Sequence, residues 1–224
     1  MDLTFFDIET GPLPDPLIAH LVPDFSAPAN YKNPEAIEGY IAQKKREWFD
    51  NAALSAVTGK VLCIGMVRSN GSMFDVLDDD NEAVNIEDFW SCWRDDFRNT
   101  KVFVGFNIKG FDLPFLIRRS WYLGLDVPPD VRPGRYWNDY KVLDLMDVWQ
   151  LGQPQDRISL DNAAKYFGIG EKLGDGKDFW KWWSEDRAKA LEYLENDLLL
   201  TVKLAEKIGA VSFVKKQGVI EASV

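Results

Sequence analysis

Histidine and cysteine are scarce in this sequence of 224 residues, which contains one histidine and two cysteines. Two thiols cannot complete a four-ligand zinc site without other donors, and the single His20 leaves little room for a catalytic triad built on histidine. Cys63 lies in an apolar run and Cys92 in a helical pattern, so a disulfide framework is not expected. Any bound metal must therefore be held by carboxylates, whose hard oxygen atoms favour Mg²⁺ or Mn²⁺.

Long apolar runs are also missing, since none approaches the roughly 20 residues that a membrane helix needs. The first residues, Met1 to Asp7, contain neither the basic region nor the apolar segment of a signal peptide. We therefore expect a cytoplasmic protein that contacts no membrane. A hydrophobic content of 46% suits one domain with a full core, so residues 1–224 are predicted to form a single domain.

Positive charge is in short supply, and the formal net charge is −10. This balance argues against non-specific, high-affinity binding to nucleic acid. It does not exclude a nuclease, because cations bound at clustered carboxylates neutralise or reverse the local charge.

Hydrophobic periodicity and turn residues predict strands that first follow one another and then alternate with helices. The predicted strands are Leu3–Glu9, Lys60–Val67, Ser72–Leu77, Val102–Phe106 and Lys141–Leu145. The predicted helices are Pro34–Ala53, Asn85–Arg98, Leu113–Leu123, Ser159–Phe167 and Glu185–Ile208. This order predicts an α/β fold with a mixed central sheet flanked by helices.

The connections between the first strands differ in length. The turn Thr10-Gly11-Pro12 is predicted to end the first strand, and residues 69–71 are typical of a hairpin turn. Between these turns, residues 13–33 predict an irregular loop, and Asn33 before Pro34 is typical of a helix start. The segment at about 13–58 is interpreted as an insertion, either a lid or substrate-contacting arm or a simple surface excursion.

The first candidate site lies in the first strand. Strand period places Asp7 and Glu9 on the face that begins with Leu3 and Phe5. Two carboxylates on a largely apolar face are costly unless they are neutralised, and a divalent cation neutralises them. The alternative is a strand end that emerges into solvent.

The second candidate site, at residues 105–112, follows a predicted buried strand and precedes a predicted helix. Asp112 is either the N-cap of that helix or an acid that supports a metal. Asn107 is either a turn residue, since Asn tolerates the left-handed conformation, or a residue near substrate.

The third candidate site is the pair Tyr193 and Asp197. These residues are separated by one helical turn and share a face of the predicted helix. The pair is either part of a functional site or a hydrogen bond on the surface.

Together the three sites resemble the DEDD exonuclease superfamily in its tyrosine-bearing branch, and they are most similar to the proofreading exonuclease domain of family-B DNA polymerases. The resemblance runs in order from Asp7 to Asp197. It rests on the blocks Phe-Asp-Ile-Glu-Thr, Asn-x-x-x-Phe-Asp and Tyr-x-x-Asn-Asp, and the histidine branch would need a histidine where Tyr193 stands. Residues 159–168 and Lys177 also look like the segment that leads into the last block.

The resemblance implies an RNase-H-like fold and a mechanism with two divalent cations, Mg²⁺ or Mn²⁺. It implies that Tyr193 orients the attacking water. The implied metal ligands are Asp7, Glu9, Asp112 and Asp197. The implied contacts of the terminal nucleotide are Thr10, Asn107 and Phe111.

The implied function is removal of nucleotides from the 3′ ends of single-stranded DNA. Trimming of RNA stays open, because ribonuclease D-type enzymes share the tyrosine branch, and so does a non-catalytic module that binds nucleic acid or a polymerase. The chain lacks room for a polymerase palm, so we expect it to act alone or beside a separate polymerase or replication protein.

The other aromatic and basic residues can each be interpreted in two ways. The aromatic run 179–183 would either stack nucleobases or pack into the core. Four cations are either substrate contacts or ordinary surface charges: Lys109, Arg118, Arg119 and Lys177.

Overall fold

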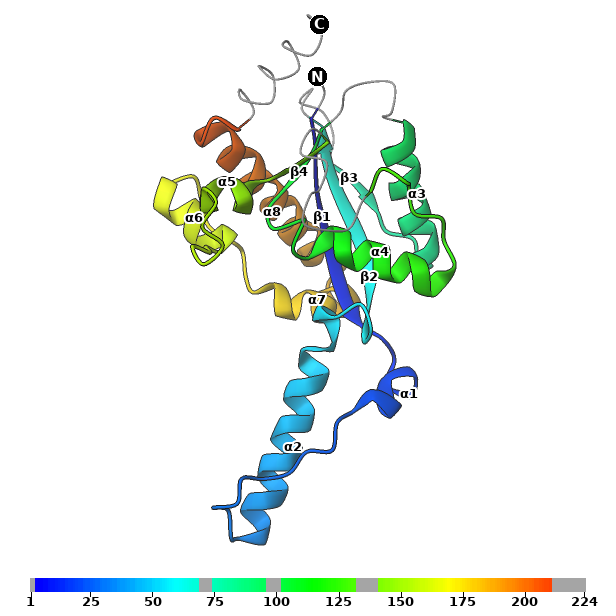
Figure 1. The fold of residues 1–224 in the computed structure, drawn as a ribbon, viewed down its shortest axis with the longest axis vertical. Helices are drawn as coiled ribbons and strands as arrows, with labels where there is room; N and C mark the ends of the chain where they lie inside the picture. Colours follow the sequence, from blue (N-terminus) through cyan, green and yellow to red (C-terminus); the bar gives the residue numbers. More distant parts are fainter. Residues whose placement is uncertain (1–2, 69–73, 96–101, 132–140, 211–224) are drawn as a thin grey trace, which may run out of the picture.

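The computed structural model describes residues 3–68, 74–95, 102–131 and 141–210, and within these ranges five strands form one mixed sheet (Figure 1). The strands are β1 (Leu3–Pro12), β2 (Gly59–Arg68), β3 (Phe74–Leu77), β4 (Val102–Gly105) and β5 (Val142–Asp144). Their order is β3-β2-β1-β4-β5. β1 pairs with β2 and β2 with β3 in antiparallel fashion, whereas β1, β4 and β5 are parallel. The predicted α/β fold with a mixed sheet is confirmed.

Helices cover both faces of this sheet and extend beyond it. The α-helices are α1 (Asp15–Ile18), α2 (Pro34–Asp50), α3 (Glu82–Asp95), α4 (Asp112–Leu123), α5 (Leu145–Gln150), α6 (Leu160–Phe167), α7 (Phe179–Glu185) and α8 (Arg187–Lys207). In the same described ranges the 3₁₀ turns are η1 (Ala19–Leu21), η2 (Ala52–Leu54) and η4 (Gly176–Asp178). Each of the five predicted helices is present, and the bounds that lie in the described ranges fall within a few residues of those expected, whereas α1, α5 and α7 were not predicted.

Two hydrophobic clusters hold the layers together, one on each face of the sheet. Leu3 and Phe5 of β1 pack into the cluster that α6, α7 and α8 complete. Phe6 and Ile8 point the other way, into the cluster completed by α3 and α4. This alternation is the one expected for a strand that is covered on both faces.

β1 continues to Pro12, so the prediction that a turn at Thr10-Gly11-Pro12 ends the strand is wrong. The register with β2 shifts between Glu9 and Thr10, and pairing then resumes as far as Pro12 and Gly59. A β-bulge of this kind bends a strand without ending it. Gly11 packs closely against β2 in this extension, because a Cβ there would lie 2.9 Å from Leu62 Cδ1 and the Leu62 side chain would have to move.

The segment between β1 and β2 leaves the body of the protein, and α2 projects away from the sheet (Figure 1). Asn33 caps α2 as predicted, with its side chain accepting from the backbone N–H of Glu35 at 2.9 Å. None of the residues of α2, all of which are described, is buried. Leu13 N donates to Thr58 O at 2.9 Å, so the two ends of the segment lie side by side. The loop predicted at 13–33 contains the short α1 and η1.

Several predictions reach beyond what the structure describes or tests. The hairpin turn at 69–71 and the end of the helix predicted to reach Arg98 lie outside the described residues. None of the helices in the described ranges combines the length and the apolar character that crossing a membrane would require. The single-domain organisation and the cytoplasmic location stay predictions.

Candidate metal centre and active site

The carboxylates of Asp7, Glu9 and Asp197 meet in space although they come from opposite ends of the sequence. One oxygen atom of each lies within 4.8 Å of those of the other two. Asp7 and Glu9 project from the middle of β1, and Asp197 projects from α8. We call these three residues the acid cluster. Its geometry is that of a site for hard cations, since such ions are bound by several carboxylate oxygens at once.

Asp112 adjoins the acid cluster at the start of α4. It is not the N-cap of that helix, a position taken by Phe111, which makes no capping hydrogen bond through its side chain. Asp112 Oδ1 accepts from the backbone N–H of Ile8 at 3.0 Å, and the carboxyl group is close enough to Asp7 for the two to affect each other's pKa. The alternative of a plain helix cap is therefore wrong, because the carboxylate is turned toward β1 instead.

Burial and mutual repulsion raise the pKa values of these acids. Burial, and next the charge of Asp197, raises the pKa of Asp7 to about 6. The pKa of Glu9 rises well above its usual range through burial and then through Asp7. The pKa of Asp112 rises well above its usual range for the same reasons, burial first and Asp7 second. Without a cation the acids therefore resist full ionisation, which is the condition that a bound divalent cation relieves.

Asp197 has one oxygen atom engaged and one without a partner. Lys172 Nζ lies 2.5 Å from Asp197 Oδ2. Asp197 Oδ1 is buried and has no hydrogen-bond partner among the described residues. An unpaired buried acceptor costs about 1–3 kcal/mol, more when it is charged. The acid cluster therefore fits a divalent cation both by its oxygen donors and by this unsatisfied atom.

Tyr193 lies one helical turn before Asp197 on α8, and the two side chains are close enough to influence each other's ionisation. The residue is 1% exposed, and its ring packs against Phe179 and Trp182. Burial, and next the charge of Asp197, raises the pKa of the Tyr193 hydroxyl above its usual range. The hydroxyl therefore stays protonated at neutral pH and acts as a hydrogen-bonding group.

A cavity of about 480 Å³ opens beside the acid cluster. Its lining includes Asp7, Asp197, Lys172, Asn107 and Arg157. Carboxylates that could hold a metal ion and basic side chains that could bind a phosphate thus line the same cavity.

The loop that carries Asn107 is held by one buried carboxylate. Asp144, at the end of β5, accepts from the backbone N–H groups of Asn107 at 2.7 Å, Lys109 at 2.9 Å and Met146 at 2.9 Å. Asn107 has a φ of 64°, in the left-handed region that Asn tolerates. Arg157 Nη2 donates to Asn107 Oδ1 at 2.8 Å, so this amide is oriented at the cavity wall.

Not every predicted contact residue reaches the cavity. Thr10 is buried in β1, and Phe111 packs its ring against Phe115 with centroids 5.5 Å apart. Neither side chain lines the cavity described above. Their contacts with a terminal nucleotide stay predictions.

The cations at the site are not those that the sequence pointed to. Arg119 is buried in an ion pair with Glu82 at 2.7 Å, and Lys177 is exposed. Lys172 and Arg157 line the cavity instead. A lysine in a loop and an arginine before a helix cap carry no signal in a single sequence. Asp144 could have been found, because it lies next to the end of the predicted strand Lys141–Leu145, and the corresponding β5 is parallel to β4, which precedes Asn107.

The aromatic run at 179–183 packs mainly inward. Phe179 is fully buried, while Trp180, Trp182 and Trp183 are half-buried against the same cluster. Packing is thus the main role that the structure gives to this run.

Residues 53–208, more than half of the chain, match the model of a family described as predicted 3′–5′ exonucleases related to the exonuclease domain of PolB. The matched range includes Asp112, Tyr193 and Asp197 and begins after Asp7 and Glu9. None of the curated proteins compared with this chain matches it.

Among solved structures, the chain is similar to the family B DNA polymerase from the hyperthermophilic archaeon Pyrobaculum calidifontis, with a TM-score of 0.60 and 20% sequence identity. The similarity covers 93% of this chain and 24% of the polymerase, so the chain spans about a quarter of that protein. It supports the predicted RNase-H-like fold.

Proposed function

Because the chain belongs to the family of predicted 3′–5′ exonucleases related to the exonuclease domain of PolB, we propose that it removes nucleotides from the 3′ ends of single-stranded DNA. The observation that carries this proposal is the acid cluster beside a cavity that is also lined by two basic side chains, Lys172 and Arg157. Family membership supports nuclease chemistry, and the preference for DNA rests on the resemblance to the proofreading domain. A separate polymerase or replication protein is the proposed partner.

In this proposal Asp7, Glu9, Asp112 and Asp197 hold two divalent cations, Mg²⁺ or Mn²⁺. Asp7 is the acid that links Asp112 to the acid cluster, since it belongs to the cluster and interacts electrostatically with Asp112. Bound cations would supply stabilisation of the negative charge that develops on the attacking and leaving oxygens. The unsatisfied Asp197 Oδ1 supports its assignment as a ligand.

The remaining residues of the site orient the attacking water and bind the terminal nucleotide. Tyr193, as in the tyrosine-bearing branch, holds the attacking water through its protonated hydroxyl, beside Asp197. Asn107 and Arg157, which line the same cavity and are hydrogen-bonded to each other, contact the terminal nucleotide. Arg157 offers planar donors to a phosphate, a group that guanidinium binds well.

The test uses matched single-stranded DNA and RNA oligonucleotides labelled at the 5′ end, with Mn²⁺, Mg²⁺ or a chelator. We expect stepwise shortening of the DNA from its 3′ end and release of mononucleotides, only with a divalent cation. Asp7→Ala is expected to lower the rate by about a hundredfold or more. The matched control is Asp15→Ala, which removes an exposed acid of α1 and is expected to leave the rate unchanged.

Digestion that persists unchanged with chelator and in Asp7→Ala would refute the metal assignment. Faster shortening of the RNA oligonucleotide would replace DNA with RNA as the substrate. Binding of either strand without shortening would favour a non-catalytic module.

A further inference from the structure

Lys172 places a positive charge directly on the acid cluster. Its Nζ lies 2.5 Å from Asp197 Oδ2 and 4.9 Å from the centre of the Tyr193 ring. Its side chain is 24% exposed, so the ion pair is largely shielded from water. Asp7 and Glu9 also attract this ammonium. The single positive charge of the Lys172 ammonium therefore faces the three carboxylates of the acid cluster.

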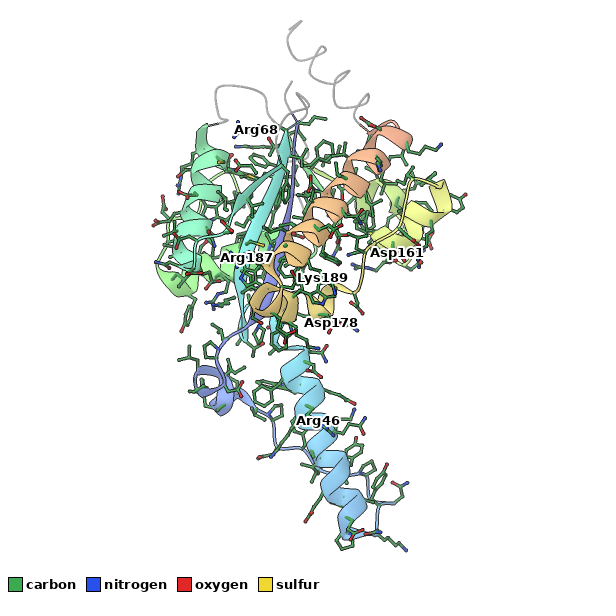
Figure 2. All side chains as sticks on the ribbon, turned by 180° about the vertical axis from the view of Figure 1, so that it is seen from behind. Arg46, Arg68, Asp161, Asp178, Arg187 and Lys189 are labelled. Atoms are coloured by element: carbon green, nitrogen blue, oxygen red, sulfur yellow. The ribbon has the colours of Figure 1, made fainter. Side chains whose placement is uncertain are left out.

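The chain around Lys172 is anchored, so this contact is built into the fold. The backbone N–H of Lys172 donates to Asp161 Oδ1 at 3.0 Å, and Asp161, labelled in Figure 2, belongs to α6. The carbonyl of Glu171 accepts from Asn196 Nδ2 of α8 at 3.1 Å. The peptide unit that joins Glu171 and Lys172 is thus tied to both α6 and α8, whereas the four-carbon stem of the lysine side chain stays flexible.

The ammonium and a divalent cation would compete for the same carboxylate. Asp197 presents Oδ2 to Lys172 and leaves Oδ1 without a partner, so the lysine satisfies only half of its capacity. A divalent cation held by Asp7, Glu9 and Asp197 would stand close to the ammonium, and two positive charges at that range repel each other strongly where water is excluded. The adjacent cavity, which Lys172 also lines, offers the flexible stem another position.

We propose that Lys172 is a resident counter-ion of the acid cluster, which stabilises the metal-free protein and competes with divalent cations for Asp197. This inference rests on the proposed function of the acid cluster as a metal site. Lys172 acts through Asp197 and is therefore a positioning residue. It sets the cation concentration at which the site fills.

The experiment measures Mn²⁺ binding to the full chain without nucleic acid, by titration calorimetry and by the shift in Tm. Lys172→Met is expected to bind the first Mn²⁺ about tenfold more tightly, equivalent to about 1.4 kcal/mol. The same variant is expected to have a lower Tm in chelator and a larger rise in Tm with Mn²⁺. Lys172→Arg, which keeps the charge, is expected to bind Mn²⁺ nearly as the natural chain does.

Lys177→Met is the matched control, because it removes the same charge from an exposed position a short distance along the chain. Its Mn²⁺ affinity is expected to stay unchanged. An equal gain in both variants would mean that net charge alone matters, and would overturn the proposal. Mn²⁺ affinity in Lys172→Met that is unchanged or weaker would also overturn it, since the lysine would then only support the acids.

The two proposals fail in different ways. If the natural chain binds no Mn²⁺, the metal site itself is refuted. If the natural chain binds Mn²⁺ and Lys172→Met binds it no better, only the counter-ion role is refuted. Should Lys172→Met not fold in chelator, Lys172→Gln, which keeps a hydrogen-bond donor for Asp197, carries the same expectations.

Discussion

Raising the pH in the presence of a chelator is expected to destabilise this protein. The pKa of Asp7 is raised from 3.8 to about 6 in the folded chain, mainly by burial and then by Asp197. A carboxyl group with a raised pKa binds its proton more tightly in the folded state than in the unfolded state. Its contribution to stability is therefore complete below the unfolded value and is lost as the pH rises through the folded value.

The size of the effect follows from the two pKa values. The full shift of Asp7 corresponds to about 3 kcal/mol of unfolding free energy. Of this, about 1.4 kcal/mol is lost between about pH 5 and pH 7.5, and the rest at lower pH. Glu9 and Asp112, whose pKa values are also raised, add losses of the same sign.

Urea unfolding at a series of pH values gives the measurement, with Asp7→Asn as the comparison. The loss of stability between about pH 5 and pH 7.5 is expected to be about 1.4 kcal/mol smaller in Asp7→Asn than in the natural chain. The comparison removes the general effect of the net charge, which both proteins share. Saturating Mn²⁺ is expected to reverse the trend in the natural chain, because metal ligands must be deprotonated.

Two results would refute this reasoning. Stability in chelator that rises over this pH range would show that the acids are not held in a shared buried site. If the unfolding free energies of the natural chain and Asp7→Asn depend on pH to the same extent, the pKa of Asp7 is not raised by its surroundings as described.

Two further variants test the support of the site. Tyr193→Phe is expected to lower kcat by about 10- to 100-fold and to leave the Mn²⁺ affinity nearly unchanged, because the hydroxyl orients water and is not a metal ligand. Steady-state kinetics measures the first effect and calorimetry the second. Weakened Mn²⁺ binding would contradict this role. Asp144→Ala leaves three backbone N–H groups without their acceptor, so the free energy of unfolding measured in urea should fall by about 2–4 kcal/mol. A fall of less than about 0.5 kcal/mol would be inconsistent with the role of Asp144 in holding the loop.

The sequence alone predicts the parts of this fold that depend on local pattern. Alternation along β1 places Leu3 and Phe5 on one face and Phe6 and Ile8 on the other, and both core clusters follow it. The acids of the cluster are predictable because each sits in a short motif of fixed spacing. Their convergence, which spacing alone does not reveal, came from the resemblance to a known family.

What could not be predicted depends on contacts between distant segments. The extension of β1 past Thr10 depends on the bulge against β2 and on the close approach of Leu62 to Gly11. The place of Lys172 depends on Asp161, Asn196 and Asp197, which belong to two different helices. A single sequence shows neither the bulge nor the helix pair, since both arise only when the chain is folded.

The hydrogen bond between Leu13 and Thr58 closes the base of the segment that carries α2, so this segment is attached to the sheet at one point. Because the β1–β2 ladder is already paired at Pro12 and Gly59, its register does not depend on how many residues hang beyond that point. Loop-closure entropy grows only slowly with length, so this outgrowth can be lengthened, shortened or exchanged for a tight turn at little thermodynamic cost. Arg46, labelled on α2 in Figure 2, belongs to a part of the chain that is free to diverge while the acids on the sheet stay in place.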